Sequence, residues 1–113
     1  MTTILNKVEA IVSAMDAHTA DYFNSAEFDD MREFAERSIS TKKAAIDARR
    51  KFFVITRDGS VVAFIDKESG DIFKPASWRT PAKGVRGNVN NADAGMGAFH
   101  FGSYGLTHVV YFK

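Results

Sequence analysis

The residue types best suited to binding chemistry lie in one short segment, positions 74 to 88. It holds both prolines of the chain, no acidic residue, the only tryptophan and four cations, namely Trp78 with Lys74, Arg79, Lys83 and Arg86. An indole ring can stack on a nucleobase, and neighbouring cations can neutralise phosphates. The segment predicts a loop that binds single-stranded nucleic acid. The alternative is that Trp78 fills the core beneath the loop while the charges stay solvated.

A second basic cluster lies at positions 42 to 51, just before the first predicted strand. In a helix, Lys42, Arg49 and Arg50 would share one face and continue the phosphate contacts toward the loop. The alternative is a solvated helix end whose cations favour the helix dipole. Asn88 either reads a base edge or shapes a turn. The candidate nucleic-acid-binding residues are therefore Lys74, Trp78, Arg79, Lys83, Arg86, Asn88, Arg49 and Arg50.

The residue types required for catalysis or metal binding do not occur at suitable spacing. The chain has no cysteine, and its histidines, at positions 18, 100 and 108, do not form a metal-binding pair. It has no nucleophile elbow, phosphate-binding glycine loop or dinucleotide fingerprint. We therefore predict no enzymatic activity, no catalytic residue, no metal site and no cofactor.

Charge is divided unevenly between the two parts of the chain. Residues 1–41 contain eight acidic and three basic residues, whereas residues 42–113 contain six acidic and twelve basic residues. This asymmetry favours a polyanion as the partner of the basic part. Alternatively, the two parts attract each other within one chain or between subunits, which makes a homo-oligomer possible.

Hydrophobic spacing predicts helices in the first half of the chain. Ile4, Val8, Ile11 and Met15 recur at helical spacing, in a helix expected to end or bend at residues 16–19. A second apolar stripe of the same period indicates a helix around residues 28–39. A third helical stretch is expected from Lys42 to Arg50.

The period changes to that of strands after residue 50. Residues 51–56 and 61–66 are rich in β-branched and aromatic residues, and the Asp58-Gly59 pair between them is a strong hairpin signal. A third strand begins at residues 72–74, and a fourth is expected at residues 105–112. We predict one α+β domain over residues 1–113, with N-terminal helices in residues 1–50 packed on an antiparallel sheet of about four strands.

The basic segment also resembles a known sequence pattern. Residues 70–78 and 81–88 are similar to a motif of small uncharacterised tailed-bacteriophage proteins, in which a short β-meander leads into Trp-x-x-Pro-Ala-Lys-x-x-Arg-x-Asn. The resemblance covers about residues 51–113. It implies a viral origin and a location in the cytoplasm of an infected bacterial host. It implies no activity and no ligand.

These observations lead to two alternative functions. The first is a small phage accessory protein that binds single-stranded DNA or RNA through the Trp78 loop. The second is an interaction module that binds or inhibits a host bacterial protein through its acidic helical half. No membrane partner is expected, because no window approaches the roughly 18 apolar residues needed to span a bilayer.

Overall fold

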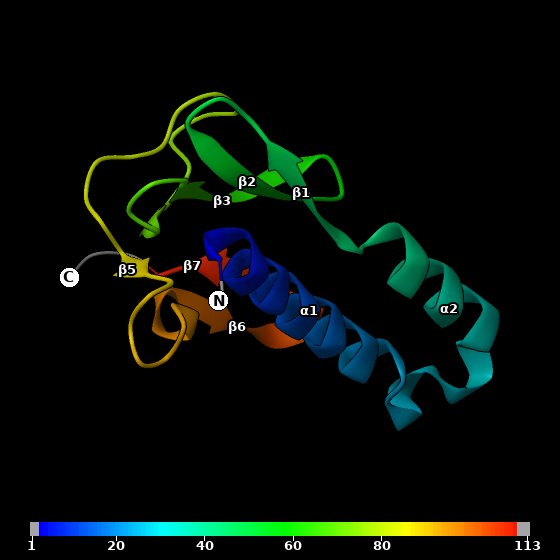
Figure 1. Cartoon of the computed structure of the whole chain (residues 1–113). Coiled ribbons are helices and arrows are strands. Elements are labelled where there is room, and N and C mark those ends of the chain that lie inside the picture. Colours follow the sequence, from blue (N-terminus) through cyan, green and yellow to red (C-terminus); the bar gives the residue numbers. More distant parts are fainter. Residues whose placement is uncertain (1–2, 111–113) are drawn as a thin grey trace.

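A computed structural model describes residues 3–110 (Figure 1). The helical elements are α1 (Ile4–Phe23), α2 (Arg32–Thr41) and the 3-10 helices η1 (Ala26–Met31), η2 (Met96–Ala98) and η3 (Ser103–Gly105). The strands are β1 (Ala44–Ala48), β2 (Phe52–Arg57), β3 (Ser60–Asp66), β4 (Asp71–Phe73), β5 (Gly87–Asn88), β6 (Phe99–Phe101) and β7 (Thr107–Val109). The predicted α+β class is confirmed.

The first helix is longer than its apolar spacing predicted. Thr3 caps its N-terminus by accepting a hydrogen bond from the Asn6 amide at 3.1 Å. The expected end or bend at residues 16–19 is wrong, because α1 continues to Phe23. The buried Thr19 hydroxyl lies 3.1 Å from both the Met15 and Gly105 carbonyl oxygens, so this polar side chain is satisfied inside the helix.

The helix predicted from Lys42 to Arg50 is also wrong, because this segment contains strand β1. Ile46 alternates with exposed neighbours, as a half-buried strand requires, and it pairs with Ile55 of β2. Pairing with β2 satisfies the backbone hydrogen bonds of the segment and partly buries Ile46. These two gains outweigh the helix preference of the alanines.

The main sheet has the order β1-β2-β3-β4-β5, and every neighbouring pair is antiparallel. The predicted hairpin is confirmed: Arg57 pairs with Ser60, and the two turn residues have φ values of 52° at Asp58 and 78° at Gly59. Positive φ at both central positions is the type I′ geometry that fits the twist of the flanking strands. The three-strand meander is therefore confirmed, and β5 is an addition that the sequence did not suggest.

The last strand joins a different sheet from the one expected. The prediction for residues 105–112 is correct for β7, but β7 pairs with β6 in a separate two-stranded sheet. Tyr111 and Phe112, the end of the predicted strand, lie outside the described residues. The chain between β4 and β7 contains β5, η2, β6 and η3.

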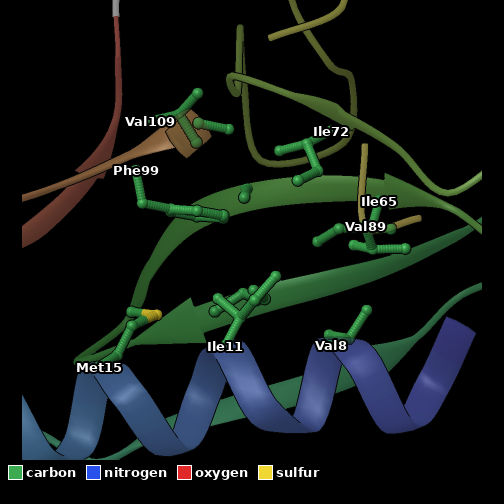
Figure 2. Packing of buried hydrophobic residues seen from close by; sticks show 11 residues of the cluster. Val8, Ile11, Met15, Ile65, Ile72, Val89, Phe99 and Val109 are labelled. Carbon is green, nitrogen blue, oxygen red and sulfur yellow. The ribbon is translucent and has the colours of Figure 1, made fainter. Parts of the chain in front are cut away.

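One core joins α1 to both sheets. Val8, Ile11 and Met15 project from one side of α1 toward the strands (Figure 2). They pack in one cluster with Ile65 and Ile72 of the main sheet and with three residues from the later part of the chain: Val89, Phe99 and Val109. Each of these side chains is at most 6% exposed. Burial of this set is the main force that holds α1 and the two sheets together.

A second, smaller core lies at the C-terminal end of α1. It consists of Phe23, Phe28 and Ala35, with Tyr22 and Ile39 packed against it. Helix α2 lies beside this end of α1 and away from the strands of both sheets (Figure 1). No helix in the described part of the chain combines the length and the apolar character that a membrane span requires.

Candidate functional site

The segment after β4 covers the face of the main sheet that α1 leaves open. Register places Phe64 opposite Phe73, and Ile65 opposite Ile72, so the two phenylalanines point away from the isoleucine face on which α1 packs. In Figure 1 the chain between β4 and β5 arcs along the side of the sheet away from α1. Phe64 is nevertheless fully buried. The loop and the side chains beneath it therefore shield this second face.

The loop itself is a narrow hairpin-like structure. The Ala82 amide donates to the Lys74 carbonyl at 2.7 Å, and Pro75 and Pro81 form an isolated antiparallel bridge. At the turn, the Ser77 hydroxyl accepts from the Thr80 amide at 3.2 Å, with the two hydroxyl oxygens 2.8 Å apart. This closed ladder fixes the two residues at its tip, Trp78 and Arg79.

Trp78 is 51% exposed and therefore does not fill the core. Arg49 holds it in place: the guanidinium carbon lies 5.1 Å from the centre of the Trp78 ring, and Nη1 donates to the Trp78 carbonyl at 2.6 Å. The same carbon lies 5.9 Å from the centre of the Phe64 ring. The Arg49 Nε donates to Asp47 at 2.8 Å, which completes an ion pair. Arg49 thus links the tip of the loop to the sheet.

The other predicted cations fall into different environments. Arg50, Arg79 and Lys83 are exposed. Arg86 is partly buried and donates through Nη1 to the Val110 carbonyl at 2.7 Å. Lys74 is also partly buried, and it lines a cavity described below. Exposed charge is therefore concentrated on Arg50, Arg79 and Lys83.

Asn88 is occupied within the fold. Its side-chain nitrogen donates to the Ser69 carbonyl at 2.9 Å and to Asp71 at 2.8 Å, while its oxygen accepts from the Asn90 amide at 2.7 Å. Of the two roles that the sequence left open, this geometry favours the shaping of a turn over the reading of a base edge.

Two hollows adjoin each other beside the Trp78 loop. One is a shallow depression that includes Trp78 and Ser77. The other is a cavity of about 310 Å³ at the junction of β3, β7 and the start of the loop. The two share Ser60, Val61 and Pro75. A ligand over the exposed indole is therefore next to the cavity.

The cavity contains polar residues that the sequence analysis missed. Arg57 and Thr107, each 8% exposed, both line it. Burial lowers the pKa of the Arg57 guanidinium from its usual value, against the opposing effect of Asp16 and Asp58. A signal was present, because strict alternation from Phe53 and Ile55 along β2 puts residue 57 on the core side of the sheet.

Within residues 3–110, no group of three or more histidine or acidic residues is arranged so that it could hold a metal ion. His100 and His108 face each other across the β6–β7 ladder with ring centres 5.1 Å apart.

Comparison with known proteins gives a family. Residues 1–102 match the profile of a family of unknown function (DUF7717). The chain belongs to this family. No curated protein and no solved structure matched it. The DUF7717 match spans both helices, the whole main sheet and the Trp78 loop, so the helical part and the basic loop belong to one family unit.

Proposed function

We propose that this protein is a small phage accessory protein that binds single-stranded DNA or RNA, in the cytoplasm of an infected bacterium. The observation that carries the binding proposal is the half-exposed ring of Trp78 at the tip of a hydrogen-bonded loop. Arg49 packs on the ring and restricts it before a ligand arrives. A base can then stack on the exposed ring surface at a low entropic cost.

The exposed cations complete this surface. Arg79 follows Trp78 at the loop tip, Lys83 lies on the returning side of the hairpin, and Arg50 is beside Arg49. Such cations contact the phosphates of a single strand without selecting its sequence. The proposal includes no catalytic step, metal or cofactor. The phage origin rests on the motif resemblance alone.

The test is the fluorescence of Trp78, which is the only tryptophan. We expect an unlabelled oligonucleotide to quench it at low salt, with affinity falling as salt rises. Trp78→Ala, followed by anisotropy of a labelled oligonucleotide, should weaken binding by about 1–3 kcal/mol. Unchanged fluorescence at low salt, together with equal anisotropy for wild type and Trp78→Ala, would contradict the proposal.

A second candidate function rests on the helices η1 and α2. Met31 is 47% exposed and Phe34 49% exposed, and the same two helices carry four exposed acidic side chains: Asp29, Asp30, Glu33 and Glu36. An apolar patch with an acidic rim suits a basic surface on a host bacterial protein. A pull-down from bacterial lysate with nuclease treatment separates the two functions. Partners that survive nuclease and are lost in Phe34→Ser favour the interaction module.

A further inference from the structure

Two residues that line the cavity between β3 and β7 each have a buried polar atom with unmet hydrogen-bonding capacity. Among residues 3–110, neither Arg57 Nη2 nor Thr107 Oγ1 has a hydrogen-bond partner. The other two nitrogens of Arg57 each have a partner, since Nε donates to the Lys42 carbonyl at 3.0 Å and Nη1 to the Gly105 carbonyl at 2.9 Å. A buried donor without a partner is costly, so a ligand that accepts from it gains more than it would on an open surface.

The charges around the cavity favour an anion. Lys42, Arg57 and Lys74 line it with a single carboxylate, that of Asp58. Asp58 lies 3.2 Å from Lys42 and forms an ion pair with it. The lining thus carries three cationic side chains and one carboxylate. Ser60 and His108 add further polar groups. The volume of about 310 Å³ is at the small end of ligand pockets.

We propose that this cavity binds a phosphoryl group, with Arg57 Nη2 and Thr107 Oγ1 as donors and Lys42 and Lys74 as the surrounding charge. A tetrahedral phosphoryl group offers several acceptor oxygens and a negative charge, which matches a guanidinium, a hydroxyl and two ammonium groups. Arg57 Nη2 is closed to water in this conformation, so the anion enters as a rim side chain moves. Leu106 lines the cavity and is 54% exposed, so its side chain has room to move at the rim.

The phosphoryl group has two possible sources, free phosphate or the phosphorylated end of a strand. The second source rests on the proposed function, because the cavity shares three lining residues with the depression beside Trp78. A strand stacked on Trp78 could then direct its terminal phosphate into the cavity.

The first experiment is calorimetric titration of the full chain with inorganic phosphate, in variants that keep the fold. Thr107→Val preserves the β-branched shape and removes a buried hydroxyl without a partner, so its unfolding midpoint should stay the same or rise. Phosphate affinity should fall about tenfold. Asp58→Asn removes the only carboxylate of the lining at a position where asparagine tolerates the positive φ, and affinity should rise about three- to tenfold.

Two control variants each remove a charge of the same sign at a residue outside the cavity lining. Lys43→Gln is the control for Lys42→Gln, which should weaken phosphate binding about threefold. Glu68→Gln is the control for Asp58→Asn. Neither control residue lines the cavity. The proposal is overturned if phosphate fails to bind, or if each cavity variant behaves like its control.

The second experiment compares oligonucleotides with and without a terminal phosphate, at the 5′ and at the 3′ end. Tighter binding of a phosphorylated strand that disappears in Thr107→Val supports the cavity as the site of a strand end. Phosphate binding that responds to the cavity variants without any oligonucleotide binding supports the cavity with free phosphate as its ligand, although the proposed function then fails. Trp78 quenching by oligonucleotides without phosphate binding overturns the cavity proposal and leaves the proposed function standing.

Discussion

Arg49 and Trp78 hold each other in place. The guanidinium carbon of Arg49 lies 5.1 Å from the centre of the Trp78 ring, and its Nη1 donates to the Trp78 carbonyl at 2.6 Å. The sequence placed both residues in one binding surface, each as a separate contact to the ligand. The structure instead assigns Arg49 to internal contacts with Asp47 and the loop. Arg49 therefore favours ligand binding by fixing the position of the indole ring.

Arg49→Met should therefore loosen the loop and weaken oligonucleotide binding by about tenfold. The substitution keeps an apolar stem between the rings but removes the hydrogen bond and the cation–π contact. The amides of Ala76 and Ser77, which donate to the Thr80 carbonyl, should exchange with solvent faster. Hydrogen exchange measured by mass spectrometry checks this. Arg50→Met is the matched control, and equal exchange in both variants would refute the positioning role.

The salt dependence of binding should be shallower than phosphate contacts from all six candidate cations would give. Six candidate cations would give a log–log slope of about −4 for a single strand at roughly −0.7 per phosphate contact. Only Arg50, Arg79 and Lys83 are exposed among them, so we expect about −2. Lys83→Gln should reduce the slope by about 0.7. Titrations between 50 and 200 mM salt measure it, and a slope near −4 would mean that Lys74, Arg49 and Arg86 also contact the strand.

Local signals predicted the parts of the fold that depend on local chemistry. The Asp58-Gly59 pair specified its own turn, because few residue types adopt positive φ at two successive positions. In the same way, the helical spacing of apolar residues predicted α1, and the β-branched and aromatic residues predicted β2 and β3. These features were sufficient for the α+β class.

The failures arose where distant segments decide the structure. The segment from Lys42 to Arg50 contains strand β1 because Ala44–Ala48 pairs with the edge of β2, and no pattern inside the segment reveals this pairing. Thr19 lies within α1, and its buried hydroxyl contacts the Gly105 carbonyl, which is far along the chain. The exposure of Trp78 and the role of Arg49 also depend on contacts between residues that are far apart in the sequence. Arg57 lies outside both basic clusters of the sequence, and its burial follows from strand alternation along β2.

Two glycines should differ in their tolerance of a methyl group. Gly59→Ala should cost about 1 kcal/mol of unfolding free energy, because the positive φ of 78° is strained but the added Cβ meets nothing within 4 Å. Gly70→Ala should cost about 2–4 kcal/mol, since its φ is 80° and the Cβ would lie 2.8 Å from Val89 Cγ2 in the core. Urea unfolding measures both values. A larger loss of unfolding free energy for Gly59→Ala than for Gly70→Ala would contradict the steric conflict expected at Gly70.

Acid should weaken the segment around η2 through Asp93. The Gly95 and Gly97 amides donate to its two carboxylate oxygens at 2.9 and 2.8 Å, which holds the pKa of Asp93 below its usual value. A carboxyl whose pKa is lower in the folded state stabilises the fold fully above the ordinary aspartate pKa of about 3.9, and this contribution is lost as the pH falls through the lowered value. Asp93→Asn should therefore lower the urea midpoint at pH 7 and differ less from wild type near pH 2.5.

The control for this acid effect is Asp21→Asn, which neutralises an exposed carboxylate in the last turn of α1. Its midpoint at pH 7 should equal or slightly exceed that of wild type, because a negative charge at a helix C-terminus is unfavourable. If the gap between Asp93→Asn and wild type were as large near pH 2.5 as at pH 7, the loss would come from altered packing. The hydrogen bonds of the ionised carboxylate would then contribute nothing to the stability of the turn.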